Sequence, residues 1–199
     1  MITHTARRGR LILTAITATA AIVVTVAAFT VSGRSPGHAF PQLRPAAAPA
    51  SWRHLTLPNG TAVLSYPPSL RPISGDKVAV SAARLTPHGA FQLYLNATPR
   101  QGSEQLAHWP AFRLHLLQAD TAAAARQIAS AQGVKFRGGT GSCVIDRYVT
   151  RISGHHFQEI ACLVVGRTSA SVIVAAAPTA AWTQARPLLL QAVAAYLIR

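Results

Sequence analysis

A run of 21 residues without a charged side chain, residues 11–31, most constrains how this chain can be arranged. As a helix it would be about 31 Å long, which matches the ~30 Å hydrocarbon core of a bilayer. Arg7, Arg8 and Arg10 precede it directly, and arginines beside a membrane span favour the cytoplasmic side. The sequence therefore predicts a basic cytoplasmic tail over 1–10, a transmembrane signal anchor over 11–31, and an extracytoplasmic remainder.

The same run also fits a signal peptide that is removed after export. Small residues at 26–28 and at 37–39 match the positions that a signal peptidase recognises. The run is longer than the roughly 7–15 apolar residues of a typical signal core, which favours the anchor. The two alternatives place the domain either at the cell membrane as a single-pass protein or outside the cell after cleavage.

Composition divides the rest of the chain into a linker and one domain. Residues 32–50 contain four prolines and two glycines, with little apolar bulk, which is typical of an extended spacer. Residues 51–199 are numerous enough to form one domain with its own hydrophobic core.

The charge is strongly basic, with 19 Lys and Arg against five Asp and Glu and a net charge of +14. Residues 51–199 hold 14 of the basic and all five of the acidic residues, so this part carries +9. The use of 17 Arg against two Lys in an alanine-rich chain is typical of a GC-rich bacterial genome. Outside a bacterial membrane such a charge attracts anionic headgroups and wall polymers, or serves solubility alone. The arginines are scattered rather than grouped among aromatic residues, which argues against a nucleic-acid partner. We expect a membrane partner, with another envelope protein or an anionic surface polymer as a further one.

Alternating apolar residues and turn signals predict several hairpins. Pro58-Asn59-Gly60 separates two short strands over 52–57 and 61–66, and Pro87-His88-Gly89 separates strands over 77–85 and 91–96. Apolar runs that follow a strand pattern predict further strands over 143–152, 156–165 and 169–177.

Two helices complete the prediction. The first begins at Ser103, which can cap free backbone N–H groups, with Glu104 complementing the positive end of the helix, and it continues through the alanine-rich segment to Gly133. Its predicted buried side carries the apolar residues Leu106, Trp109, Phe112 and Leu116. The second covers Thr179 to Ile198, with Thr179 as its cap. Because hairpins outnumber strand–helix–strand units, we expect an α+β fold, with a mainly antiparallel sheet and two packed helices.

The chain contains two cysteines, Cys143 and Cys162. They lie about ten residues either side of the hairpin apex at Ser153-Gly154, so they are expected to be neighbours across two paired strands. An exported chain with two cysteines permits a disulfide, and we predict one between them.

A few residues resemble a known family. They are Trp52, the turn at 57–60, the strand end at 66–70, and the start of the last helix at 178–179 with Trp182. This pattern resembles the PsbP-like superfamily, which includes extrinsic photosystem proteins and small exported actinobacterial proteins of the LpqN type. The resemblance implies an αβα-type sandwich used for docking or ligand binding, generally without catalysis, and it carries over no functional residue.

The chain offers weak candidates for catalytic or metal chemistry. His155 and His156 are adjacent on a strand and would point to opposite faces, which does not suit one metal site. His108 and His115 lie seven residues apart, too far along a helix for one ion.

Catalytic motifs are equally weak. Asp146, Glu159 and His155 could converge across a hairpin, but no nucleophile motif accompanies them. The sequence therefore assigns no catalytic, cofactor or metal residue.

These observations lead to a functional expectation rather than a reaction. We expect a membrane-tethered extracytoplasmic domain with a binding or accessory role at the bacterial cell envelope. The alternatives are a cleaved, secreted hydrolase or metal-binding protein whose site is not recognisable, and a structural subunit of a membrane complex that uses the apolar helix as its interface.

Overall fold

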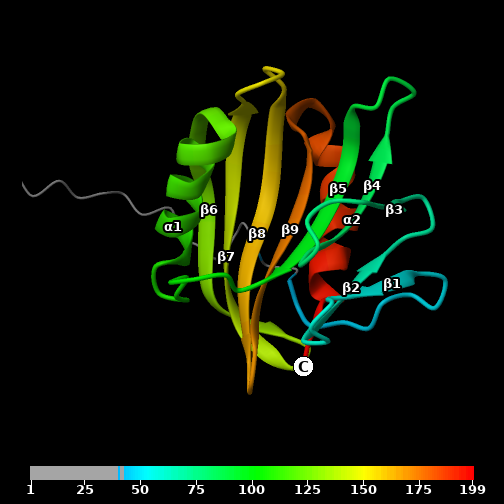
Figure 1. Ribbon diagram of the computed structural model, residues 1–199, viewed down its shortest axis with the longest axis vertical. Helices are drawn as coiled ribbons and strands as arrows, with labels where there is room; N and C mark the ends of the chain where they lie inside the picture. Colours follow the sequence, from blue (N-terminus) through cyan, green and yellow to red (C-terminus); the bar gives the residue numbers. More distant parts are fainter. Residues whose placement is uncertain (1–39, 41–42) are drawn as a thin grey trace, which may run out of the picture. The chain divides into compact units, whose positions relative to one another are not determined.

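The longest strands of the chain lie side by side in one antiparallel sheet. The computed structural model describes residue 40 and residues 43–199, except the side chains of residues 120–122. In this part of the chain seven strands are hydrogen-bonded in the order β3-β4-β5-β9-β8-β7-β6 (Figure 1). Their bounds are β3 Arg71–Ile73, β4 Val80–Leu85, β5 Phe91–Pro99, β6 Ala122–Phe136, β7 Gly139–Thr150, β8 His156–Gly166 and β9 Ala170–Pro178.

A smaller, three-stranded sheet packs beside it, in the order β1-β2-β10. Two of the predicted hairpins are confirmed: β1 pairs with β2, and β4 pairs with β5. Their turns hold Gly60 at φ +73° and Gly89 at φ +80°, which is the backbone region that glycine adopts without strain. The bounds of this sheet are β1 Arg53–Thr56, β2 Ala62–Tyr66 and β10 Leu197–Ile198.

The two faces of the large sheet have different covers. Helix α2 (Trp182–Ala194) packs on β8 and β9, and with the small sheet it covers what we call the α2 face. Helix α1 (Trp109–Leu116) packs on β6, β7 and β8, on the opposite side that we call the α1 face (Figure 1). This arrangement confirms the predicted α+β fold with a mainly antiparallel sheet and two packed helices.

Most of the hydrophobic core lies on the α2 face. It combines inward-facing strand residues such as Leu95 and Ile173 with Leu189 of α2 and Leu64 of the small sheet, and all four are at most 1% exposed. A second, smaller cluster lies under α1 around Trp109 and Leu163. The indole Nε1 of Trp109 donates a hydrogen bond to the carbonyl oxygen of Ala161 at 3.0 Å, which fixes α1 to the sheet.

The predicted disulfide is present between Cys143 and Cys162. The two residues are direct partners in the register of β7 and β8, and both side chains are buried in the core of the α2 face. The hairpin prediction for this part of the chain is thereby confirmed as well.

The segment before the domain differs from the extended spacer predicted over 32–50. Phe40 and Leu43 are buried in the α2-face core, and the backbone N–H of Ala46 donates to the carbonyl of Ala194 at 3.0 Å. The described part of the segment therefore packs on the folded unit, because its two large apolar side chains find a place in the core.

The long first helix predicted over 103–133 is wrong. Helix α1 begins at Trp109, a π-helical turn follows over Leu117–Thr121, and the alanine-rich segment then forms the long strand β6. Pairing of β6 with β7 satisfies its backbone groups, and this tertiary gain outweighs the helix propensity of alanine. Gly133 sits at a register shift within β6, not at the end of a helix.

The beginning of α1 also differs from the prediction. The Glu104 carboxylate accepts hydrogen bonds from the backbone N–H groups of Gln101 and Gly102, at 3.1 and 2.7 Å. It therefore organises the loop before the helix and does not complement the helix N-terminus.

The last predicted helix ends earlier than expected. A short 3₁₀ turn over Thr179–Ala181 leads into α2, which contains Pro187 and ends at Ala194. The chain then continues as β10, whose pairing with β2 replaces further helix. Thr179 makes no side-chain cap on this turn, contrary to the predicted capping role.

The predicted cytoplasmic tail and anchor, including Arg7, Arg8 and Arg10, lie outside the described residues. Within the described residues, none of the helices has the length and apolar character that crossing a bilayer requires. The anchor and its orientation stay predictions.

Candidate functional site

An ion pair lies between α1 and the sheet. Arg113 in the last turn of α1 reaches Glu159 of β8, with Nε donating to Oε1 at 2.7 Å and Nη2 donating to Oε2 at 3.0 Å. The Glu159 side chain is 1% exposed and that of Arg113 15%. Burial alone would lower the pKa of Arg113, but the charge of Glu159 and its hydrogen bonds raise it above the ordinary value.

A second carboxyl group stands directly beside this pair. Asp146 of β7 is the register partner of Glu159, so both side chains leave the sheet on the α1 face. Asp146 is fully buried, and neither carboxyl oxygen has a hydrogen-bond partner among the described residues. Burial, reinforced by the negative charge of Glu159 and opposed by Arg113, raises the pKa of Asp146 to about 7.

Tyr148 lies on the same face of the sheet as the buried Asp146 and Glu159. It lies two residues after Asp146 on the same face of β7, and its ring stacks on Phe157 at a centroid distance of 6.0 Å. Burial, the charge of Glu159 and a hydrogen bond with Glu159 raise the pKa of Tyr148, so its hydroxyl is neutral at physiological pH.

The part of the α1 face that α1 does not cover forms a groove of about 440 Å³. Its floor is built by β4, β5, β9, β8 and β7, and the loop between β3 and β4 borders it. Tyr148 and Phe157 lie on one side of the groove, and Phe91 and Tyr94 lie on the other. The rings of Phe91 and Tyr94 are arranged edge to face, with their centroids 5.2 Å apart. We call this the aromatic groove.

Polar groups are interspersed with these rings. Asn96 Nδ2 donates to Ser81 Oγ at 2.8 Å, and the Ser81 hydroxyl lies 3.5 Å from the Tyr94 hydroxyl. Thr98 completes this row on β5, and Asp76 of the bordering loop is the one charged residue among the described residues that line the groove. Apolar rings with a few converging hydroxyl and amide groups are the usual lining of small-molecule sites.

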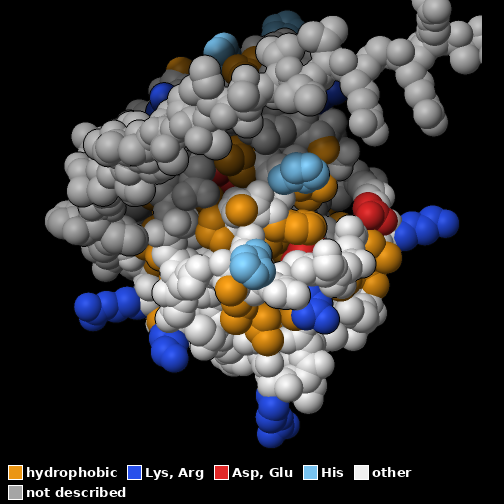
Figure 2. All heavy atoms as spheres, turned by 90° about the vertical axis from the view of Figure 1, so that its left-hand side faces the viewer, with side chains coloured by type: hydrophobic (Ala, Val, Ile, Leu, Met, Phe, Trp, Pro, Cys, Tyr) orange, Lys and Arg blue, Asp and Glu red, His pale blue; other side chains and the backbone are white. Residues whose placement is uncertain are grey.

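Figure 2 shows the molecule from the α1 side. Apolar and histidine side chains occupy the middle of this view, and most of the visible Lys and Arg side chains project from its rim.

Most of the candidate site residues that the sequence suggested lie apart from one another in the structure. Asp146 and Glu159 are brought together as the hairpin register predicts, but His155 is exposed at the hairpin tip and does not join them. His156 is also exposed. Across the part of the chain that the structure describes, no three His, Cys, Asp or Glu residues are grouped to hold a metal ion.

Arg113 is the member of the cluster that sequence reasoning missed. It lies four residues after the buried Trp109, so the two side chains share one side of the helix. An arginine on the buried side of a helix requires a buried acid as its partner. Asp146 and Glu159 are the acids that lie within apolar predicted strands, so the sequence could have indicated one of them as the partner of Arg113.

Comparison with known proteins identifies the fold. No protein-family model matches the chain, and no curated protein is significantly similar in sequence. The solution structure of cyanobacterial PsbP (CyanoP) from Synechocystis sp. PCC 6803 matches with a TM-score of 0.52 and 11% identity, over 76% of this chain and 95% of that one. The fold is PsbP-like. This confirms the resemblance found in the sequence, as a statement about the fold alone.

Two further solved structures have lower scores. A protein of unknown function, PA94 from Pseudomonas aeruginosa, gives a TM-score of 0.49 at 11% identity, over 74% of this chain and 97% of that one. LpqN, which is involved in cell envelope biogenesis of Mycobacterium tuberculosis, gives 0.46 at 11% identity, over 74% and 90%.

Proposed function

We propose that this protein is an exported accessory domain of the bacterial cell envelope that binds a neutral small ligand in the aromatic groove. The observation that carries the proposal is the groove itself. It is a hollow of about 440 Å³ on the side of the sheet that α1 leaves open, with four aromatic rings and the Ser81–Asn96 hydrogen-bond pair in its lining.

The chemistry of the lining indicates the class of ligand. Aromatic rings bind flat apolar surfaces, whereas the hydroxyl and amide groups of Ser81, Asn96 and Thr98 bind polar substituents. The buried Arg113–Glu159 pair lies under α1 and is absent from the groove lining, so it supports the scaffold and offers no charge to the ligand. A neutral molecule with an apolar ring and hydroxyl groups suits this site.

Export is supported by separate observations. The uncharged run over 11–31 follows three arginines, and the buried Cys143–Cys162 disulfide is typical of proteins that fold outside the cytoplasm. We propose that the run anchors the domain to the membrane and that the domain works there beside another envelope component.

Binding is tested by NMR titration of the isotope-labelled full chain with phenyl β-glucoside, a neutral probe with a ring and hydroxyls. We expect saturable shifts that cluster at groove residues such as Ala176. Thr98→Trp fills the groove and should abolish them, whereas the matched Thr56→Trp, on exposed β1, should leave them unchanged. Shifts that persist in Thr98→Trp would contradict binding in the groove.

Fractionation of cells that express the full chain tests the tether. An anchored protein stays with membranes after a high-salt wash, and a cleaved protein is released with a new N-terminus near Phe29 or Phe40. Detection of the intact chain in the cytoplasm would contradict export.

A further inference from the structure

The lower end of the large sheet in Figure 1 collects basic residues from distant parts of the chain. The β6–β7 turn and the β8–β9 turn meet there, because Gly139 pairs with Gly166 in the register of β7 and β8. The end of β5 joins them, since the backbone N–H of Arg100 donates to the carbonyl of Ala170 at 2.9 Å.

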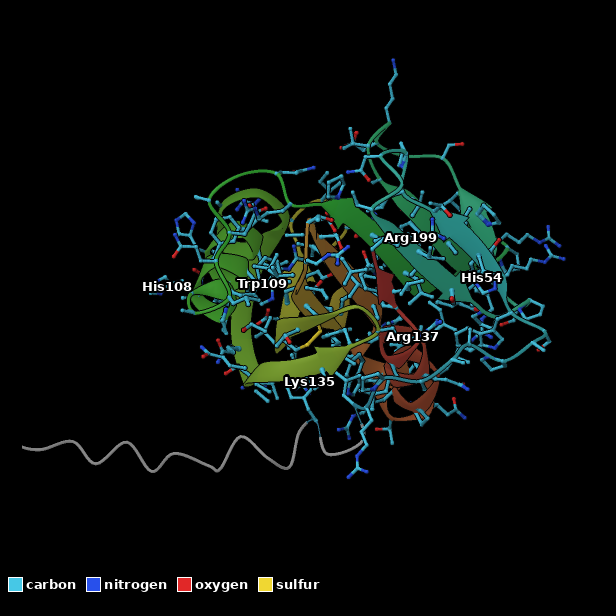
Figure 3. The ribbon with its side chains drawn as sticks, turned by 90° about the horizontal axis from the view of Figure 1, so that it is seen from below. His54, His108, Trp109, Lys135, Arg137 and Arg199 are labelled. Atoms are coloured by element: carbon cyan, nitrogen blue, oxygen red, sulfur yellow. A yellow bond between two sulfur atoms is a disulfide. The ribbon has the colours of Figure 1, made fainter. Side chains whose placement is uncertain are left out.

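The C-terminal residues reach the same end. The backbone N–H of Ile198 donates to the carbonyl of Arg137 at 3.0 Å, and the Ser169 hydroxyl donates to the carbonyl of Arg199 at 2.5 Å. Figure 3 looks onto this end and labels three of its basic residues. We call it the basic end, and it comprises Arg100, Lys135, Arg137, Arg167 and Arg199.

The basic end is open to solvent and poor in acid. Its side chains are exposed, apart from the half-buried Arg137. Of the described acids, Asp146 and Glu159 are buried under α1, and Asp76 lies in the β3–β4 loop. Glu104 is buried and accepts two backbone N–H groups. Among the described residues, no side-chain carboxylate therefore neutralises the positive charge of this end.

The N-terminal segment joins the folded unit next to this end. Phe40 and Leu43 line a hollow of about 610 Å³ together with Lys135. Only residues 32–39 separate Phe40 from the predicted anchor, and eight residues span at most about 30 Å. An anchor at 11–31 would thus keep this end of the unit close to the bilayer.

We propose that the basic end docks on an anionic lipid surface and sets the orientation of the domain on the membrane. This inference rests on the proposed export and anchoring, and it is independent of ligand binding in the aromatic groove. Each basic side chain near an anionic surface strengthens binding by about fivefold, so the loss of three weakens docking roughly 100-fold. The attraction is screened by salt.

The test uses the full chain with a fluorophore on Thr168→Cys, in the β8–β9 turn, and vesicles that carry a nitroxide-headgroup quencher. Vesicles of phosphatidylcholine alone are compared with vesicles that contain phosphatidylglycerol. We expect quenching to be strong in the anionic vesicles, weak in the neutral ones, and reduced by 0.5 M salt. A fluorophore on Ser153→Cys, at the opposite hairpin tip, should stay unquenched in both.

Two matched charge variants complete the experiment. Lys135→Gln/Arg167→Gln/Arg199→Gln should lower quenching in anionic vesicles to the neutral level. Lys77→Gln/Arg84→Gln/Arg126→Gln removes the same number of exposed charges elsewhere and should retain it. Equal losses in the two variants, or equal quenching at Thr168 and Ser153, would overturn the proposal. Failure of the full chain to associate with neutral vesicles would instead count against the anchor.

Discussion

The two faces of the seven-stranded sheet differ in how far they are covered and in which side chains they bury. The α2 face is covered by α2, the small sheet and the N-terminal segment, and its buried side chains are almost all apolar. The α1 face is covered only in part, and it holds the Arg113–Glu159 ion pair, the unpartnered Asp146 and the aromatic groove. The comparison indicates that one face stabilises the fold through apolar burial, while the other buries charged groups beside an open groove.

The largest effect is expected from breaking the ion pair on the α1 face. Arg113→Met leaves the Glu159 carboxylate buried without its counter-charge, and we expect the free energy of unfolding to fall by about 3–5 kcal/mol. Urea denaturation at pH 7 measures this. The double variant Arg113→Met/Glu159→Leu should recover most of the loss, and no recovery would show that Arg113 stabilises the fold through packing alone.

Adjacent residues of β5 test the contrast between the faces directly. Leu95 is 1% exposed in the α2-face core, and Leu95→Ala should cost about 2–5 kcal/mol through lost burial and a cavity. Asn96 faces the aromatic groove, and Asn96→Ala should cost about 1 kcal/mol or less through its hydrogen bond to Ser81. Both values come from denaturant unfolding, and similar costs for the two would contradict the contrast.

The disulfide in the α2-face core should contribute to the free energy of unfolding by an amount comparable to that of Leu95. It closes a loop with a sequence separation of 19, so Cys143→Ala/Cys162→Ala is expected to lower the free energy of unfolding by about 3 kcal/mol. The measurement compares oxidised protein with the double variant, and with the wild type in reductant. An unchanged unfolding midpoint would argue against a disulfide in the native protein.

A pH-dependent effect is expected at Asp146. Its folded pKa of about 7 exceeds the ordinary value of 3.8, so the folded state binds the extra proton between these pH values. Stability should therefore decrease as pH rises from about 4 to 7 and level off above 7.

Asp146→Asn removes the ionisable group and should flatten this dependence, with a gain of about 1 kcal/mol at pH 8. The gain is limited because the amide stays buried beside Glu159, Arg113 and Tyr148. Denaturation midpoints at pH 5 and pH 8 test this, and a pH dependence as steep as that of the wild type would assign the titration to another group.

Strands with clear turn signals were predictable from sequence. The hairpins at Pro58-Asn59-Gly60 and Pro87-His88-Gly89 follow from local backbone preferences, and the Cys143–Cys162 pair follows from the distance of each cysteine from the hairpin apex. Residues 122–136 were not predictable in this way, because alanine favours helix locally and only pairing with β7 makes the segment a strand.

The candidate site was predictable in part. The hairpin register placed Asp146 next to Glu159, but the helix that supplies Arg113 was predicted to be too long and its buried side was judged by apolar residues alone. The aromatic groove depends on β5, β9, β8 and β7 lying side by side, and no local pattern specifies that strand order.

The sequence by itself determined the antiparallel α+β class, the disulfide and the resemblance to PsbP-like proteins, because turns, alternation and cysteine spacing act over short stretches of chain. Only the tertiary structure decided that the alanine-rich segment is a strand, that Phe40 and Leu43 belong to the core, and that α1 leaves part of a sheet face open. These outcomes depend on which distant surfaces can be buried together, and burial is a property of the whole fold.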